Sequence, residues 1–237
     1  MPTYPFKDFD GSSHRVLARL IPRWSRLGGR LVDLGASGGE LGHLVRHHFK
    51  ETFAFEREIA NIGALAGRFD KVVMADLEHI ESIPAAPDAV VLADVLEHMR
   101  DPQILLRRTA EALPPGGRAF ISLPNVACLP IRLHLLAGRF TYADRGILDR
   151  THLRFFTRGT AREEIERSGL RVLHVQPTLI PIRLVWPGAP RPLIRVAEWM
   201  LGLATRIRPT LLAYQFVFVC GRAACPERSE RVPARAP

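Results

Sequence analysis

The stretch of sequence that decides the fold is Leu31-Val32-Asp33-Leu34-Gly35-Ala36-Ser37-Gly38-Gly39-Glu40-Leu41-Gly42. An apolar strand runs directly into a turn of small residues, and the turn runs into a helix. Small residues let the backbone approach a ligand closely, and the first turn of a helix offers unpaired N–H groups. In an open α/β sheet, this junction is where nucleotide-like ligands bind. The stretch therefore predicts such a ligand at the end of the first strand.

The spacing of the small residues separates two kinds of ligand. A dinucleotide fingerprint requires G-x-G-x-x-G, and the third position counted from Gly35 is Ser37. A nicotinamide-dependent reductase is therefore the least favoured reading. What remains is Asp-x-Gly-x-small-x-Gly, with Asp33 closing the strand. A carboxylate there suits a ligand with positive charge, such as S-adenosylmethionine (SAM), which carries an amino cation and a sulfonium.

Two further acidic residues close the next two expected strands. Glu56 ends the strand at 52–56, where a carboxylate can accept hydrogen bonds from both ribose hydroxyls. Asp76 follows the strand at 71–75, where it can accept a hydrogen bond from an adenine amino group. Asp33 alone could equally be a cap or turn residue, and Glu56 alone could equally be a solvated charge. Three acidic strand ends in chain order beside a glycine turn indicate a nucleoside site.

Strands and helices alternate along most of the chain. We expect strands at residues 30–34, 52–56, 71–75, 88–93, 118–123, 170–175 and 211–220. We expect helices at residues 12–21, 40–48, 59–66, 102–113, 160–168 and 190–208, the first ending at Pro22. This alternation predicts an α/β, Rossmann-like, doubly wound sheet with helices on both faces and right-handed crossovers.

The domain organisation follows from where this alternation holds. We expect an N-terminal helical segment at residues 1–29 and a ligand-binding domain at 30–222. That domain would carry a lid or insertion at 125–157 and an apolar helical insertion at 177–209. The charged, proline-bearing tail at 223–237 is expected to be disordered.

The net charge of +9 comes almost entirely from arginine, because lysine occurs only at Lys7, Lys50 and Lys71. A basic surface can attract nucleic acid, anionic lipid or a phosphorylated substrate. The alternative is an arginine-rich composition spread over a solvated surface. The arginines are scattered rather than clustered in sequence, which favours the second interpretation.

The cysteines and the N-terminus bear on location. Cys128, Cys220 and Cys225 form no CxxC pair and have no metal-ligand spacing, so we expect a reducing cytoplasm and no metal. The first ten residues contain no apolar core of a signal peptide. No apolar run approaches the ~18 residues of a membrane-spanning helix.

Residues 12–222 resemble the class I SAM-dependent methyltransferases. The stretch from Asp33 to Gly39 is similar to the first motif of that family, with Ala36 and Ser37 where many members have cysteine and glycine. Residues 91–98, VLADVLEH, resemble the strand-four motif of its small-molecule members, and residues 113–117, LPPGG, resemble the turn before strand five. The resemblance implies a seven-stranded sheet whose last strand is antiparallel. It also implies a SAM site lined by Asp33, Gly35, Ala36, Ser37, Gly39, Glu56, Asp76, Leu77, Ala93 and Asp94.

A narrower resemblance lies in the expected lid. Residues 138–142, GRFTY, and 146–157, GILDRTHLRFFT, are similar to a bacterial subgroup found beside or fused to glycosyltransferases of surface-polysaccharide pathways. The helix start at Ser12-Ser13-His14 is similar too. This resemblance implies that the methyl acceptor is a sugar or a lipid-linked glycan.

Three residues are candidates for acting on the acceptor. A hydroxyl acceptor gains roughly 10²–10⁴-fold from a general base, and histidine titrates closest to neutral pH. His152 is the first candidate because it lies in the lid, with Asp149 placed to orient it, and His98 follows strand four. The alternatives are that His152 only fastens the lid by hydrogen bonds, and that His98 only stabilises a loop.

The segment 190–208 can form an amphipathic helix. Its polar stripe is Arg191, Arg195, Glu198, Gly202 and Arg206, and apolar residues cover the rest. A broad apolar face suits a homodimer contact or peripheral attachment at the inner membrane. Packing over the substrate pocket would explain the same pattern.

Three functions remain open on the sequence alone. The leading one is a SAM-dependent O-methyltransferase acting on a sugar or another small metabolite. The second is an RNA or protein methyltransferase, and the third is a non-catalytic SAM-fold scaffold. DNA is not expected as a partner, since Asp94-Val95-Leu96-Glu97 stands where amino-methylating DNA enzymes carry Asp/Asn-Pro-Pro-aromatic.

Overall fold

The computed structural model describes every residue except 1–8, 10, 85, 183–185, 187 and 224–237, so most of the expected tail lies outside the described residues. Its centre is a seven-stranded sheet in the order β3-β2-β1-β4-β5-β7-β6. The strands are β1 (Arg30–Leu34), β2 (Glu51–Glu56), β3 (Lys71–Met74), β4 (Ala89–Ala93), β5 (Arg118–Pro124), β6 (Leu170–Pro177) and β7 (Gln215–Arg222). The pairs among β1 to β5 are parallel, and β7 is antiparallel to both β5 and β6. The expected fold class, with its antiparallel last strand, is confirmed.

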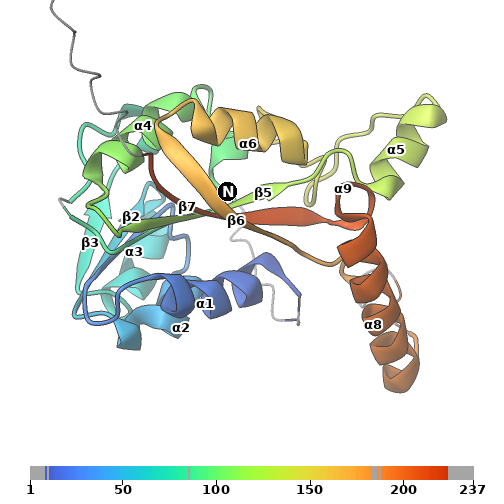
Figure 1. Ribbon diagram of the computed structural model, residues 1–237, viewed down its shortest axis with the longest axis horizontal. Coiled ribbons are helices and arrows are strands. Elements are labelled where there is room, and N and C mark those ends of the chain that lie inside the picture. The colour runs from blue at the N-terminus through green and yellow to red at the C-terminus, as the bar shows by residue number, and fades with distance from the viewer. Residues whose placement is uncertain (1–8, 10, 85, 183–185, 187, 224–237) are drawn as a thin grey trace, which may run out of the picture.

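Helices cover both faces of this sheet (Figure 1). They are α1 (Ser13–Trp24), α2 (Glu40–Val45), α3 (Ile59–Ala66), α4 (Pro102–Ala112), α5 (Leu129–Leu136), α6 (Arg158–Glu166), α8 (Arg191–Ile207) and α9 (Pro209–Leu212). Among the described residues, three short 3₁₀ turns follow strands or helices: η1 (Arg46–His48), η2 (Leu77–His79) and η3 (Leu96–His98). Helices α1 and α2 lie on one side, with α4 and α6 on the other.

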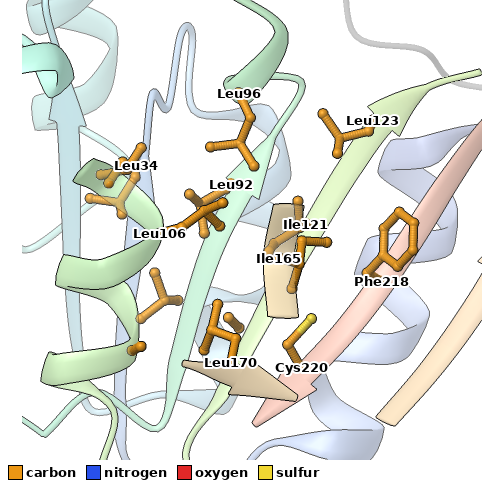
Figure 2. Close-up of a cluster of buried hydrophobic side chains, with 14 of the residues drawn as sticks. Leu34, Leu92, Leu96, Leu106, Ile121, Leu123, Ile165, Leu170, Phe218 and Cys220 are labelled. Carbon is orange, nitrogen blue, oxygen red and sulfur yellow. The ribbon is translucent and has the colours of Figure 1, made fainter. Parts of the chain in front are cut away.

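Because side chains alternate along each strand, the sheet contributes to two hydrophobic layers, one on each of its faces. Leu92 and Ile121 pack under α4 and α6, against Leu106 and Ile165, as Figure 2 shows. Their neighbours along the strands, such as Val91 and Phe120, point the other way and pack with Leu17 of α1. Burial on both faces explains why these strands are continuously apolar.

The first helix differs from its expected end. Ser12 caps it, accepting a hydrogen bond from the Arg15 amide at 3.2 Å, but Pro22 lies inside the helix rather than ending it. Proline lacks one N–H, so near the last turn the helix loses a single hydrogen bond. The turn still closes, because the Ser25 amide donates to Ile21 at 3.0 Å. Pro22 is therefore tolerated where we expected a break.

Two expected element boundaries were wrong, those of the last strand and of the helix at 40–48. The last strand begins at Gln215 rather than Leu211, because residues 209–212 form α9 with Pro209 in its first turn, a position that proline favours. The expected lid at 125–157 contains a helix of its own, α5. The expected helix at 40–48 ends at Val45 and continues as η1.

Helix α8 carries its apolar face outward. Trp199 and Ile207 are 70% and 68% exposed, and only Ile194 and Thr205 of this helix are buried. In Figure 1 the helix extends away from the body of the molecule. Packing over a pocket therefore does not account for its pattern. No helix in the described part of the chain has the length and apolar character needed to cross a bilayer.

Candidate functional site

The glycine turn joins β1 to α2 and leaves its backbone bare. Gly35 and Gly39 have φ of +79° and +81°, and Ser37 has φ of +49°, all in the left-handed region. A Cβ on Gly35 would lie 2.8 Å from Val95, and one on Gly39 would lie 2.7 Å from Leu65. Both positions therefore require glycine for two independent reasons, conformation and space. The turn is shaped so that a ligand can lie directly against the main chain.

Two buried carboxylates lie beside this turn. Asp33 and Glu56 are only 3% and 7% exposed. Burial, followed by the negative charge of Glu56, raises the pKa of Asp33 to about 7. The Glu56 carboxylate accepts hydrogen bonds from the amides of Ser37 (2.7 Å), Arg57 (2.9 Å) and Glu58 (2.7 Å). A close pair of buried acids is costly without a counter-charge, so the site fits a ligand that brings a cation.

The third acidic strand end is more exposed. The Asp76 carboxylate accepts a hydrogen bond from the Glu78 amide at 3.0 Å and so caps η2. One oxygen of the same carboxylate still faces the His79 imidazole at 3.6 Å. Leu77 packs against the core at the start of η2.

Asp94 is hydrogen-bonded to side chains of β5 and β7, the next two strands in the sheet. It follows Ala93 at the end of β4, with a strained φ of +56°. Its carboxylate accepts hydrogen bonds from the hydroxyl of Ser122 on β5 (2.5 Å) and from the side-chain amide of Gln215 on β7 (3.0 Å). Sequence reasoning missed Ser122 and Gln215. The available signal was that each is a polar residue next to a run of apolar residues, and the structure buries both.

The strand order brings these acids to one edge. Because β3, β2, β1 and β4 are neighbours and parallel, their carboxyl ends align, and each is followed or closed by one acid. The acids along this edge are Asp76, Glu56, Asp33 and Asp94. The point where the strand order reverses, between β1 and β4, is where such sheets bind ligands.

The lid places a buried histidine at the same end of the sheet. His152 is 8% exposed, and its Nδ1–H donates to the Ile147 carbonyl oxygen at 2.9 Å. This bond leaves Nε2 with a lone pair. Burial lowers the pKa of His152, so the ring is neutral near pH 7. The geometry required of a proton acceptor is therefore present.

The residue that orients His152 is not the one expected. The Asp149 carboxylate accepts hydrogen bonds from the amide (2.8 Å) and the hydroxyl (2.7 Å) of Thr151, while the Ile147 carbonyl holds the imidazole. Asp149 shapes the loop that carries His152. The physical reason is the tight turn at 149–152, which directs the carboxylate back to its own backbone.

His98 and the lid fasten to each other. The Nδ1 of His98 lies 3.2 Å from the Thr151 carbonyl oxygen, and its ring centroid is 4.8 Å from that of His152. The Glu97 carbonyl accepts hydrogen bonds from the amides of Leu153 and Arg154 at 2.8 and 3.0 Å. Both histidines thus also serve the structural role that the alternatives proposed.

An open hollow of about 440 Å³ adjoins His152. Its lining combines aromatic, apolar and cationic side chains, namely Tyr142, Arg150, His152, Leu153 and Phe155. The rings of Tyr142 and Phe155 lie 6.3 Å apart, with Phe140 between 5 and 6 Å from both. The hollow is thus suited to a ring-shaped molecule that carries negative charge.

A doubly wound sheet with an acid-lined glycine turn at its switch point defines a nucleoside-binding α/β fold. The sequence matches the methyltransferase domain family over residues 9–175, more than half of the chain. The protein belongs to that family. SAM is the cofactor that the family and the buried acidic pair together fit.

Curated relatives agree with this assignment. Ubiquinone biosynthesis O-methyltransferase of Xylella fastidiosa (strain M23) is 30% identical over 146 residues, covering 59% of each chain. The enzyme of the same name from Xanthomonas oryzae pv. oryzae (strain PXO99A) is 30% identical over 106 residues, covering 41% of this chain and 44% of its own. The chain therefore spans about half the length of these relatives.

Solved structures share the fold at low identity. A SAM-dependent methyltransferase of Archaeoglobus fulgidus is 20% identical, with a TM-score of 0.60 and coverage of 90% and 96% of the two chains. A 1,6-didemethyltoxoflavin-N1-methyltransferase of Burkholderia thailandensis, bound to S-adenosylhomocysteine, is 15% identical, with a TM-score of 0.59 and coverage of 91% and 80%. The [4+2]-cyclase SpnF is 18% identical, with a TM-score of 0.59 and coverage of 90% and 82%. The fold alone therefore does not determine the reaction.

Proposed function

We propose that the protein is a SAM-dependent O-methyltransferase acting on a small-molecule acceptor. The observation that carries the proposal is that an acid-lined glycine turn and the free Nε2 of a neutral histidine lie at the same end of one sheet. The curated relatives are named O-methyltransferases, which supports oxygen as the accepting atom.

The residues of the turn bind and orient the cofactor. SAM supplies a methyl group already activated on a sulfonium, so alignment of donor and acceptor is the main task of the protein. Asp33 faces the positive charge of the cofactor, and Glu56 accepts from its ribose hydroxyls. Asp76 and Leu77 contact the adenine, and Asp94 closes the site beside Ala93. Gly35, Ala36, Ser37 and Gly39 let the cofactor lie against the backbone.

His152 acts on the acceptor. Its Nε2 takes the proton of the acceptor hydroxyl, since Nδ1 is engaged with Ile147 and the ring is neutral. His98 is packed edge-on against it and restricts its movement. Asp149 is a positioning residue that holds the loop through Thr151.

The hollow favours an acceptor with a ring and an anionic group. Aromatic side chains pack on the faces of sugars and aromatic rings. The Nε of Arg150 pairs with Asp144 at 3.1 Å, and its two terminal nitrogens can pair with a phosphate. A phosphate-linked sugar or a lipid-linked glycan meets both requirements, in keeping with the resemblance of residues 138–157 to the polysaccharide-associated subgroup. Inner-membrane association would bring the enzyme to such a substrate.

The position of α8 supports that association. The first residue of β7, Gln215, pairs with Pro124 at the end of β5. Helices α8 and α9, which precede β7 in the chain, therefore connect to the sheet at the end where β5 finishes and the lid begins. The helix offers exposed apolar side chains together with Arg191, Arg195 and Arg206, which suits an anionic lipid surface. A homodimer through 190–208 is the competing use of this face.

An RNA or protein acceptor is the second candidate, because the lid carries five exposed arginines. They are Arg132, Arg139, Arg145, Arg150 and Arg154. An RNA substrate would make binding fall steeply as salt rises, since each phosphate contact contributes to the slope. A small-molecule acceptor predicts a shallow dependence.

Calorimetric titration with SAM, with NADH as a control, tests the cofactor first. An acceptor screen of nucleotide sugars and lipid-linked glycans follows.

His152→Ala should then lower kcat by roughly 10²–10⁴-fold and leave SAM affinity unchanged, because the residue acts on the acceptor alone. His134→Ala, on the exposed surface of α5, is the matched control. Failure to bind SAM by folded protein would point to the scaffold function, and loss of folding by His152→Ala would assign that residue a structural role.

A further inference from the structure

Three side chains with metal-binding atoms converge where η3 meets the lid. They are Glu97, His98 and His152, and one ligand atom from each lies within 4.8 Å of the others. The first two are adjacent in sequence, and the third comes from the lid, more than fifty residues later. Cysteine spacing alone predicts no metal site in this chain. The fold is needed to bring the two imidazoles and the carboxylate together.

The hydrogen bonds around the two histidines fix the same tautomer in both. The Nδ1 of His152 lies 2.9 Å from the Ile147 carbonyl oxygen, and the Nδ1 of His98 lies 3.2 Å from that of Thr151. The Thr151 hydroxyl also lies 3.1 Å from the His98 Nδ1, but it donates its single hydrogen to Asp149 at 2.7 Å. Because all of these oxygens then act as acceptors, each Nδ1 carries the hydrogen and each Nε2 keeps its lone pair. Metal-ligating histidines are typically oriented in this way, with the second nitrogen donating to a backbone carbonyl or a carboxylate.

The carboxylate of the cluster is buried. Glu97 is 1% exposed, and carboxylates are rarely found at such depth without compensation by positive charge or hydrogen bonds. Its own carbonyl accepts from Leu153 and Arg154, which locks the lid onto η3 and fixes His152 opposite. Both η3 and the lid therefore hold their ligand side chains in position before any cation binds.

We infer that Glu97, His98 and His152 form a binding site for a divalent transition-metal cation of the Zn²⁺ type, open toward the hollow beside His152. Two imidazoles and one carboxylate form a donor set that zinc uses in catalytic sites, leaving a position for a further ligand. Imidazole nitrogens suit Zn²⁺, Co²⁺ and Ni²⁺, whereas Mg²⁺ prefers oxygen ligands. Because His152 also lines the hollow, the open position faces the proposed acceptor.

This inference rests on the proposed methyl transfer from SAM to a hydroxyl, and it replaces the proton-accepting role of His152 with that of a metal ligand. A hydroxyl bound at the open position becomes more acidic and releases its proton to water. The oxygen then forms a bond to the methyl carbon while the carbon–sulfur bond breaks, which leaves S-adenosylhomocysteine as a neutral thioether. With the cation bound, Nε2 of His152 is a ligand, and it is not available as a proton acceptor.

Titration of chelator-stripped full-length protein with Zn²⁺ alone, followed by calorimetry, tests the site directly. We expect a single strong equivalent, weak binding of Mg²⁺, and visible absorption of a low-symmetry site when Co²⁺ is used. Glu97→Gln and His98→Gln should each lower the affinity for Zn²⁺ by about 100-fold or more, since loss of an outer-shell partner alone costs 10–100-fold. Circular dichroism and SAM titration show whether each variant is folded.

The matched control disrupts a histidine pair elsewhere on the surface. The rings of His47 and His48 lie 3.8 Å apart, and His47→Gln removes an exposed imidazole there that could bind zinc adventitiously. Zinc binding abolished by His47→Gln but retained in Glu97→Gln would overturn the inference, as would the absence of strong binding to folded protein. Such a result leaves the proposed function standing if SAM still binds.

Activity separates the two roles of His152. If His152 is only a proton acceptor, Glu97→Gln should retain turnover, and a metal chelator should not change the turnover of the wild type. If the cluster binds a cation, chelation and Glu97→Gln should reduce turnover together, with SAM affinity preserved. Turnover that is unchanged by both chelation and Glu97→Gln would contradict the metal site.

Discussion

At the scale of single residues, the site depends on a carboxylate whose environment disfavours its charge. Asp33 is buried at the end of β1, and burial together with Glu56 raises its pKa from 3.8 to about 7. Between these values the folded protein binds a proton that the unfolded chain releases. The free energy of unfolding of the cofactor-free protein should therefore fall as pH rises from about 4 to about 7. Stability from this group is complete below pH 4 and lost above pH 7.

Asp33→Asn should remove this dependence. Since one pKa unit corresponds to about 1.36 kcal/mol, the variant should be more stable than the wild type by up to ~4 kcal/mol near pH 8, with a much smaller difference near pH 4. SAM affinity should fall, because the carboxylate that faces its positive charge is gone. Urea unfolding of both proteins across this pH range is the measurement. A wild-type stability that rises toward pH 8 through this group, or tight SAM binding by Asp33→Asn, would contradict the assignment.

Some of these residues could be predicted and others could not. Asp33, Glu56 and Asp94 each close a strand, and in a parallel sheet the carboxyl ends meet at one edge, so their proximity follows from the sequence pattern. Ser122 and Gln215 were missed, since their contacts with Asp94 join residues 28 and 121 positions apart. The orienting role of Ile147 was also missed, because it comes from a backbone carbonyl that carries no side-chain signature.

At the scale of elements, the junction between β1 and α2 depends on glycine. Gly39 begins α2 with φ of +81°, and a Cβ there would lie 2.7 Å from Leu65 and 3.0 Å from Phe69. Gly39→Ala should destabilise the protein by about 1–3 kcal/mol through backbone strain and steric overlap. It should also weaken SAM binding, because the turn must shift. Urea unfolding and SAM titration measure both effects.

Gly63 of α3 is the matched control, since a Cβ there has nothing within 4 Å and its φ is not in the left-handed region. Gly63→Ala should stabilise the protein by roughly 0.5–1 kcal/mol, because alanine favours a helix interior. Equal effects of the two substitutions would show that strain at Gly39 is not what the turn requires.

Element boundaries were predictable where local signals decide them and not where packing does. The strand at 30–34 and the helix at 59–66 match β1 and α3. Pro22 was wrongly taken as a stop, because α1 is supported by the sheet it packs on, with Leu17 and Ile21 fully buried. The amphipathic pattern at 190–208 identified α8 but could not show that its apolar face points outward.

At the scale of the whole molecule, the outward face of α8 predicts binding to an anionic lipid surface. Trp199 and Leu203 are exposed, so Trp199→Asp with Leu203→Asp should change stability by no more than about 0.5 kcal/mol each while abolishing binding to vesicles containing anionic lipid. Leu27→Asp is the control, since Leu27 is 57% exposed between α1 and β1. Vesicle flotation is the measurement. Retained flotation with a change from dimer to monomer would assign the face to self-association.

The stability of the whole domain should also report the cofactor. SAM binds the folded chain and brings positive charge to the buried Asp33–Glu56 pair, so it should raise the free energy of unfolding by about 2.7 kcal/mol at a concentration of 100 times Kd. For a domain of this size, that corresponds to an increase in Tm of about 5–10 °C. NADH should produce no increase, since the turn lacks the dinucleotide spacing at Ser37. Differential scanning fluorimetry with both ligands is sufficient, and Asp33→Asn should lose the SAM-dependent increase while remaining folded. An increase with NADH instead of SAM would indicate a reductase. No increase with either ligand would favour the scaffold function, because the two buried acids would then not serve to bind a cationic cofactor.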